Sequence, residues 1–299
     1  MSASHVVVPL TNKSTNGRLI VGLARAQLRA LAWLSPALAD RRAAALFFTP
    51  RPTGRVAEPA VPGLRAERFA VTSGGRRLAA WSWGEGEAVL LVHGWNGHGG
   101  QLSGFVEPLV RSGFRAVAFD QPAHARSAGR RTTVLEMAEA IQAVARVAGP
   151  LRAVVAHSLG ATATALALHD HLPAGRAVLL APPAEAPYFA RAMAAQLGLS
   201  EERTAGMIAQ VERVVGVHLG SIDVRRFAEW IRQPALVFHD PGDREVPFEH
   251  GRAIADAWPG ARLVPLHGLG HKRLLGDEAV IRETVAFLRQ GRARTAALG

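Results

Sequence analysis

Short apolar runs alternate with helical stretches from about residue 67 onward, and this alternation constrains the fold most. The runs are AVLLVH, RAVAFD, LRAVVAH, RAVLLA, ALVFHD and ARLVPL. The helical stretches between them include 133–147, 159–168, 248–258 and 277–289. A continuous apolar run is typical of a strand that is buried on both faces of a parallel sheet. The sequence therefore predicts an α/β fold, with a mostly parallel, doubly wound sheet and helices on both faces.

Two segments depart from this alternation. ERFAV and RRLAAWSW, separated by the turn residues Ser73-Gly74-Gly75, predict an antiparallel pair that opens the sheet. A helical stretch of about fifty residues lies between the runs RAVLLA and ALVFHD, and ARAMAAQLGLS and EERTAGMIAQVERVVG are its clearest pieces. We expect this insertion, at about 183–232, to form a small helical lid over the carboxyl edge of the sheet, where active residues gather.

The region before the sheet, residues 1–62, predicts a helical segment followed by a proline-rich linker, TPRPTGRVAEPAVPG. Apolar residues recur there at helical spacing with arginines between them: Leu19, Ile20, Leu23, Leu28, Leu31 and Leu34. The favoured interpretation is a helix docked on the main domain or its lid. The alternative is a basic amphipathic helix on a membrane surface. The main domain is predicted at 63–291, with a tail at 292–299.

Composition limits the classes of partner and location. The chain has 299 residues and a net charge of +11. Because it contains no cysteine, disulfides and thiol catalysis are excluded. A basic surface favours anionic partners, but no nucleic-acid module is present and no nucleic-acid partner is expected. Arg18, Arg25 and Arg29 interrupt the N-terminal apolar stretch, which argues against a membrane span. With no secretory signal recognised, we expect a cytoplasmic protein, with peripheral membrane contact through the N-terminal helix as the alternative.

The segment AVVAHSLGATATALAL carries the clearest chemical signal. A buried strand runs into a sharp turn around Ser158 and then into a helix of small residues. This is the pattern of a nucleophile elbow, G-x-S-x-G, in which the strained turn exposes the serine hydroxyl above the sheet. Ala156 replaces the first glycine of the pattern, whereas Gly160 keeps the second.

From about residue 67 to 289 the chain resembles the α/β-hydrolase family, in its serine esterase and lipase-like branch. Five markers carry the resemblance in the family's order: LVHGW, FDQPAHARSAG, the Ser158 elbow, HDPGDREVP and GLGHKRLL. The second marker is similar to the family's D-x-P-G-H-G-x-S turn, with Ala123 and Ala125 in place of the glycines. An aspartate nucleophile, as in dehalogenases and epoxide hydrolases, is excluded by Ser158.

The resemblance implies a role for each marker. Ser158 would be the nucleophile, His271 the base that takes its proton, and Asp243 the acid that orients His271. The backbone N–H groups of Trp95 and Leu159 would form the oxyanion hole. No metal and no cofactor are expected.

Several neighbours of the proposed triad compete for these roles. Asp243 is preferred to Asp240 because DREVP matches the family's acid turn, and Glu185 is a weaker substitute. We expect His157 to point away from the nucleophile. His93 and Asp120 would brace the loops that follow their strands. His267 is expected to be structural.

An apolar acyl-binding pocket under the lid would be lined by Trp95, Tyr188, Phe189, Met193 and Met207. Ordinary packing between lid and core is the alternative for each of them. The sequence predicts a serine hydrolase that cleaves a small-molecule carboxylic ester or related acyl bond through an acyl-enzyme on Ser158. An acyltransferase with the same triad and a non-catalytic binding protein on the same fold are the alternatives.

Overall fold

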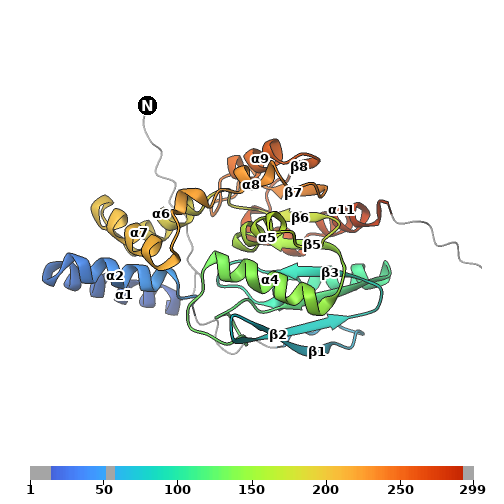
Figure 1. The fold of residues 1–299 in the computed structure, drawn as a ribbon, viewed down its shortest axis with the longest axis horizontal. Coiled ribbons are helices and arrows are strands. Elements are labelled where there is room, and N and C mark those ends of the chain that lie inside the picture. The colour runs from blue at the N-terminus through green and yellow to red at the C-terminus, as the bar shows by residue number, and fades with distance from the viewer. Residues whose placement is uncertain (1–14, 52–57, 292–299) are drawn as a thin grey trace, which may run out of the picture.

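A single sheet of eight strands, in the order β1-β2-β4-β3-β5-β6-β7-β8, organises the molecule (Figure 1). The computed structural model describes residues 15–51 and 58–291. β2 is antiparallel to β1 and β4, and the remaining neighbours are parallel. The strands are β1 (Glu67–Ser73), β2 (Arg76–Trp83), β3 (Glu87–Val92), β4 (Phe114–Phe119), β5 (Leu151–His157), β6 (Ala177–Leu180), β7 (Ala235–His239) and β8 (Ala261–Pro265). The predicted fold, including its antiparallel opening pair, is confirmed.

Alternate side chains of the strands enter two hydrophobic cores, one on each face of the sheet. On β3, for example, Leu90 and Val92 enter one core, and Val89 and Leu91 enter the other. The first core is covered by α4 (Val134–Ala148), α5 (Leu159–His169) and α9 (Phe248–Ala257). The second core is covered by η1 (Gly99–Phe105), α3 (Val106–Arg111), η3 (Leu274–Gly276) and α11 (Glu278–Arg289). The sheet is therefore doubly wound, as the continuous apolar runs predict.

Local capping explains why the helices begin where the sequence predicts. At the start of α4, the Thr133 hydroxyl accepts from the Glu136 amide (3.1 Å), and the Glu136 carboxylate accepts from the Thr133 amide (2.8 Å). At the start of α11, the Asp277 carboxylate accepts from the amides of Ala279 and Val280. The helices α4, α5, α9 and α11 begin and end within about one residue of the predicted bounds.

Four short helices lie between β6 and β7, within the predicted insertion at 183–232. They are α6 (Ala186–Leu197), α7 (Glu201–Val215), η2 (Leu219–Ser221) and α8 (Val224–Ala228). They begin where β6 ends, at the carboxyl edge of the sheet (Figure 1). Their position fits a lid, which stays a prediction.

The N-terminal region forms two helices, α1 (Thr15–Leu34) and α2 (Pro36–Phe47), which lie side by side against α6 and α7 (Figure 1). We call α1 and α2 together the N-terminal hairpin. The docked side of α1 buries Val21 and Leu28. Most of the predicted apolar stripe is exposed instead: Leu19, Ile20, Leu23 and Leu34. No helix of the described residues is long and apolar enough to cross a bilayer.

Parts of the predicted domain division lie outside the described residues. These parts are residues 1–14, residues 52–57 of the proline-rich linker and the tail at 292–299. The separation of residues 1–62 from the main domain stays a prediction.

Candidate active site

Ser158 occupies a strained turn between β5 and α5. Its backbone has φ 52° and ψ −129°, a conformation that costs a non-glycine residue free energy of about 1–3 kcal/mol. The Ser158 amide donates to the Leu180 carbonyl oxygen (2.9 Å), which fixes the turn on β6. A Cβ atom at Gly160 would lie 2.4 Å from the His93 carbonyl oxygen, so the helix and the loop after β3 meet too closely for a side chain. Ala156 is fully buried in β5, and its methyl group occupies the position where the family pattern has glycine.

The structure brings the three predicted triad residues together. The Ser158 hydroxyl lies 3.0 Å from His271 Nε2, and His271 Nδ1 lies 2.8 Å from Asp243 Oδ2. Ser158 comes from the end of β5, Asp243 from the turn after β7, and His271 from the short helix α10 (Gly270–Arg273) after β8. Both distances are within the range required for proton transfer from a serine to a histidine that a third group orients.

Asp243 is held as a carboxylate. Its Oδ1 accepts from the amides of Glu245 (2.7 Å) and Val246 (3.0 Å), and His239 Nε2 lies 3.5 Å from its Oδ2. Burial raises the pKa of Asp243, but the contacts from His239 and His271 outweigh burial and hold the pKa well below its ordinary value. Asp243 is therefore charged at neutral pH and accepts a hydrogen bond from His271.

Asp240 has a structural role and accepts hydrogen bonds from three backbone amides. Its Oδ2 accepts from the amides of Leu269 and Gly270 (2.6 Å), and its Oδ1 accepts from the Gly242 amide (2.7 Å). Burial raises the pKa of Asp240, but these backbone hydrogen bonds outweigh it and lower the pKa. Asp240 therefore ties the start of the His271 helix to the end of β7.

His157 packs directly against His271, although its place after the elbow strand predicts a side chain that points away from the nucleophile. The ring centroids lie 4.8 Å apart, and His157 Nε2 lies 2.8 Å from the His271 carbonyl oxygen. Burial, together with the nearby His271, lowers the pKa of His157 to about 3. A neutral His157 therefore donates its Nε2–H to that carbonyl oxygen, and this bond and the ring contact help to fix the position of His271.

The loop after β3 is braced by two buried histidines. His93 lies 2.7 Å from the Gly94 carbonyl oxygen through Nδ1 and accepts from the Gln121 amide (2.9 Å) through Nε2. His124 accepts from the Asn96 amide (3.2 Å), and its ring packs on Trp95 at 5.3 Å. Burial lowers the pKa of His93 to about 4 and that of His124 to about 3, so both are neutral acceptors.

Two amides are predicted for the oxyanion hole: that of Leu159, which follows Ser158 in the chain, and that of Trp95, in the loop after β3. Gly94 adjoins the serine so closely that a Cβ atom there would lie 2.9 Å from Ser158 Cβ. Among the described residues, neither amide donates a backbone hydrogen bond outside the helices and strands, and Leu159 is the first residue of α5, whose amide has no partner within the helix. Both donors are therefore available to a ligand oxygen.

The turn after β4 keeps the backbone of the family pattern without its glycines. Ala123 has φ 63° and Ala125 has φ 42°, the left-handed region that favours glycine. Asp120 joins this turn to the start of η1, because its carboxylate accepts from the amides of Gly99 (2.8 Å) and Arg126 (3.0 Å). The predicted bracing position of Asp120 agrees with these contacts.

A small apolar pocket lies beside the two predicted oxyanion residues. Its lining residues are Phe47, Phe48, Trp95, Thr132, Thr133, Val134, Leu159, Ala186, Phe189, Val215, Leu219 and Ile222. Trp95 and Phe189 were predicted for such a pocket, and we call this cavity the acyl pocket because of its position. Phe47 and Phe48 could not be assigned to it from the sequence, since they precede the sheet by some twenty residues or more.

Three residues predicted for the pocket do not line it. The Tyr188 hydroxyl donates to the Glu245 carbonyl oxygen (3.0 Å), and its ring packs on His250. Met193 and Met207 are buried in the core that the inserted helices share with the sheet. This burial agrees with the alternative of ordinary packing between the inserted helices and the core.

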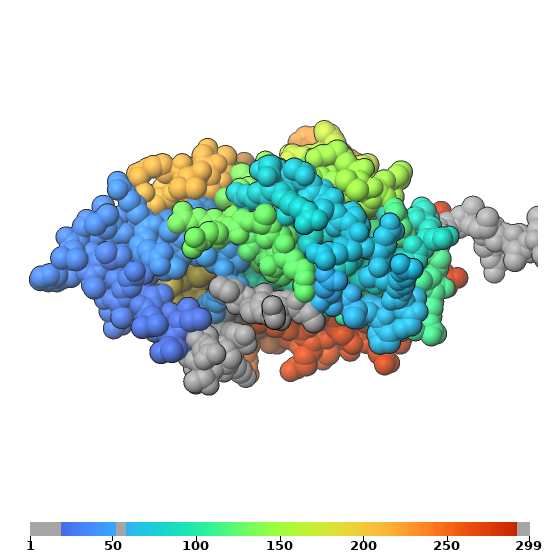
Figure 2. All heavy atoms as spheres, turned by 90° about the horizontal axis from the view of Figure 1, so that it is seen from below, coloured from blue at the N-terminus to red at the C-terminus, as the bar shows by residue number. Residues whose placement is uncertain are grey.

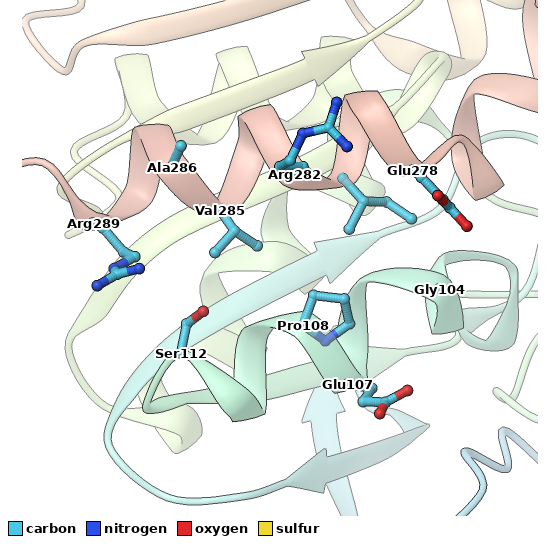
Figure 3. A pocket seen from close by; sticks show the side chains of 10 residues that line it. Gly104, Glu107, Pro108, Ser112, Glu278, Arg282, Val285, Ala286 and Arg289 are labelled. Atoms are coloured by element: carbon cyan, nitrogen blue, oxygen red, sulfur yellow. The ribbon is translucent and has the colours of Figure 1, made fainter.

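A larger groove lies elsewhere, between α3 and α11 (Figure 3). It has a volume of about 520 Å³, and its charged lining residues include Glu107, Glu278 and Arg282. None of its lining residues belongs to the Ser158 site. Among the residues with a described placement, no three histidine, aspartate or glutamate side chains are grouped to hold a metal ion.

Two family models match the chain. The model described as serine aminopeptidase, S33, matches residues 85–206, and the model described as TAP-like protein matches residues 222–297. The first segment contains Ser158, and the second contains Asp243 and His271. A comparison with curated proteins finds no match.

Solved structures with the same fold include several hydrolases. An esterase from Pyrococcus furiosus is 18% identical, with a TM-score of 0.63, and the match covers 80% of this chain and 98% of that chain. A thermophilic esterase from Thermogutta terrifontis is 20% identical, with a TM-score of 0.59 and coverage of 75% and 98%. A predicted hydrolase from Thermoplasma acidophilum is 18% identical, with a TM-score of 0.57 and coverage of 76% and 99%. Together with the two family models and the eight-stranded sheet, these similarities place the chain in the α/β-hydrolase fold family.

Proposed function

We propose that the chain is a serine hydrolase that cleaves a carboxylic ester or a related acyl bond through an acyl-enzyme on Ser158. One observation carries the proposal: the Ser158 hydroxyl is 3.0 Å from His271 Nε2, and His271 Nδ1 is 2.8 Å from the Asp243 carboxylate. A serine hydroxyl is a poor nucleophile until a base takes its proton, and this arrangement supplies the base and its orienting acid.

In the first half of the reaction, Ser158 Oγ attacks the acyl carbon while its proton passes to His271 Nε2. Asp243 stabilises the resulting imidazolium through Nδ1–H. The negative charge on the tetrahedral intermediate is stabilised by the amides of Trp95 and Leu159. His271 then donates the proton to the leaving oxygen, which departs as an alcohol and leaves Ser158 acylated.

In the second half, His271 takes a proton from a water molecule as that water attacks the acyl-enzyme. The carboxylic acid leaves when His271 returns the proton to Ser158 Oγ. An acyltransferase would run the same second half with an alcohol or amine in place of water. Adding such an acceptor during turnover and measuring the ester or amide formed distinguishes the two outcomes.

The acyl pocket favours an apolar acyl group. Its lining is aliphatic and aromatic apart from Thr132 and Thr133, which suits a hydrocarbon chain. An aminopeptidase, the activity in the description of one matching family model, must also hold the positive charge of a peptide N-terminus. None of the lining residues is acidic, so the pocket favours an acyl ester over a peptide.

The test is pre-steady-state hydrolysis of p-nitrophenyl butyrate. We expect a burst of p-nitrophenol equal to the enzyme concentration, because acylation with this good leaving group is faster than hydrolysis of the acyl-enzyme. Ser158→Ala is expected to abolish the burst and reduce turnover to the background rate. Ser221→Ala, a change of an exposed serine in the inserted region, should keep both.

A burst of p-nitrophenol in Ser158→Ala as large as that of the native protein would mean that another residue is the nucleophile. A folded native protein without burst or turnover on esters of every chain length would favour the non-catalytic binding protein.

A further inference from the structure

The end of α2 reaches the acyl pocket from outside both segments that match the family models. Phe47 and Phe48 line the pocket together with Trp95 and Leu159, the two residues proposed for the oxyanion hole. The matched segments begin at residue 85, so the N-terminal hairpin is additional to them. Two of its aromatic side chains nevertheless line the pocket beside the proposed oxyanion residues.

A chain of aromatic contacts joins the hairpin to the loop after β3. The ring centroids of Phe47 and Phe48 lie 5.4 Å apart, and Phe47 lies 5.5 Å from Phe189 of α6. Phe189 in turn lies 5.9 Å from Trp95. These edge-to-face pairs stabilise one another beyond the burial of their area. Phe47 is therefore held between the hairpin and the inserted helices.

Backbone hydrogen bonds fix the same segment on both sides of the pocket. The Phe48 carbonyl oxygen accepts from the Thr132 amide (2.9 Å), which joins it to the start of α4. The Arg51 amide donates to Asn96 Oδ1 (2.7 Å), next to Trp95. The residues that follow α2 are thus attached to two walls of the pocket.

The hairpin is also anchored on α7. Asp40 of α2 and Arg203 of α7 form an ion pair at 3.0 Å in which both side chains are largely buried. A Cβ atom at Gly206 would lie 2.1 Å from Asp40 Oδ2, so α2 and α7 approach closely here. The position of Phe47 is therefore set by a fixed helix interface.

We propose that Phe47 closes the acyl pocket and limits the length of the acyl chain that the enzyme accepts. This inference rests on the proposed esterase function. The cavity has a volume of about 30 Å³, room for about two water molecules, so it accepts only a short acyl group as it stands. The preferred substrates are then esters of short acids, and Phe47 is a specificity-determining residue.

The test compares kcat/KM for p-nitrophenyl esters from acetate to octanoate. Phe47→Ala removes a ring from the pocket wall, so each additional methylene that becomes buried should raise kcat/KM roughly fourfold. We expect the octanoate-to-butyrate ratio to rise about tenfold or more. Phe47→Trp should lower the same ratio, since a larger ring fills the cavity.

Phe69→Ala is the matched control, because Phe69 of β1 packs against the same core but does not line the pocket. Its chain-length profile should equal that of the native enzyme. Equal losses on all esters in Phe47→Ala, or the same profile shift in Phe69→Ala, would overturn the proposal. The burst of p-nitrophenol should persist in Phe47→Ala, so failure of this inference is distinguishable from failure of the proposed function.

A second inference rests on the outward face of α1. Leu19, Leu23, Trp33 and Leu34 fall on one side of this helix by its period and are 63%, 62%, 86% and 70% exposed. Ile20 is 54% exposed at the edge of the same face. The hairpin, blue in Figure 2, forms one end of the molecule. We call these five residues the apolar face of α1.

Charge identifies what this face would bind. The hairpin carries Arg18, Arg25, Arg29, Arg41 and Arg42. Asp40 is its only acidic residue, and Asp40 is paired with Arg203. Two copies of so basic a hairpin repel each other, whereas an anionic lipid surface attracts both the arginines and the apolar side chains. We propose that the apolar face of α1 docks on an anionic lipid surface.

Vesicle sedimentation with the Ser158→Ala protein tests this docking without hydrolysis. Binding is expected to vesicles of phosphatidylcholine with phosphatidylglycerol, to weaken with added salt, and to be weak on phosphatidylcholine alone. Leu23→Ser combined with Trp33→Ser should abolish binding. Trp230→Ser, which removes another exposed tryptophan, should leave it unchanged.

Absence of binding to the anionic vesicles would overturn the proposal. A dimer in solution that the Leu23→Ser, Trp33→Ser change dissociates would assign the face to a second copy instead.

Discussion

Backbone strain gathers around Ser158. Asn96, Ala123, Ala125 and Ser158 all have positive φ although none is glycine. Asn96 and Ser158 flank the proposed oxyanion hole, and the two alanines lie in the turn that carries His124. Strained residues persist where surrounding contacts hold them, and here they position a nucleophile and two loops.

Gly160→Ala should displace the loop that carries the oxyanion donor Trp95 and lower kcat. The new Cβ atom would lie 2.4 Å from the backbone oxygen of His93, so the loop that carries Trp95 must move. Losing one oxyanion donor lowers kcat by about 10²–10³, and we expect a loss of that order in ester hydrolysis. Gly220→Ala, with open space around its Cβ position, is the control. Native kcat in Gly160→Ala would contradict the proposed oxyanion geometry.

Asp243→Asn should leave the fold intact and nearly abolish turnover. The asparagine keeps the shape of the side chain but no longer favours the tautomer in which His271 Nδ1 donates. We expect kcat to fall by about 10⁴-fold, with a circular dichroism spectrum like that of the native protein. A loss of less than about tenfold would assign the orienting role to another acid.

The sequence was sufficient to predict the triad of Ser158, Asp243 and His271, because each of these residues follows a strand whose apolar run is recognisable. It was insufficient for residues whose task depends on packing across the sheet. His157 lies next to Ser158 in the chain, yet its partner His271 is 114 residues away. His239 and Asn96 are likewise defined by contacts that no local pattern encodes.

At the scale of elements, periodicity predicted the helices but not their partners. Apolar residues occur on two sides of α1, so the pattern could not determine which side is buried. The structure buries Val21 and Leu28, whereas Leu19, Leu23 and Leu34 of the predicted stripe are exposed. The methionines of α6 and α7 show the same limit, since helical spacing alone does not separate a pocket wall from a helix interface.

The interface between α2 and α7 should depend on Arg203. Arg203→Ala leaves Asp40, which is 8% exposed, without its partner in a largely buried position. We expect faster amide hydrogen exchange throughout α2, measured by mass spectrometry. Arg213→Ala, which removes an exposed arginine bonded to Gln210 on the same helix, should leave exchange in α2 unchanged. Equal exchange in both variants would mean that apolar packing alone holds the hairpin.

At the scale of the whole molecule, three buried neutral histidines make the fold sensitive to acid. The pKa of His93 falls to about 4, and those of His124 and His157 fall to about 3, in each case first because of burial. In the unfolded chain each titrates near 6.5. The unfolded state therefore binds more protons than the folded state between these values, and acid favours unfolding.

The free energy of unfolding should consequently fall as the pH drops from about 6.5 toward 4. Each of the three histidines contributes a slope of about 1.4 kcal/mol per pH unit in this window. Guanidinium unfolding curves at near-neutral pH and at about pH 5 measure the change. His157→Gln should reduce the slope by about 1.4 kcal/mol per pH unit, while His218→Gln, at an exposed position, should not alter it. Equal stability at the two pH values would contradict the neutral state of these side chains.

The central claim, an activated serine at position 158, is tested most directly by labelling with a fluorophosphonate probe and locating the adduct by peptide mass spectrometry. The account predicts a single adduct on Ser158, no labelling of Ser158→Ala, and labelling of His271→Ala slowed by about 10³-fold or more, because the base that activates the hydroxyl is missing. Undiminished labelling of Ser158→Ala, or an adduct on another residue of the folded native protein, would contradict it.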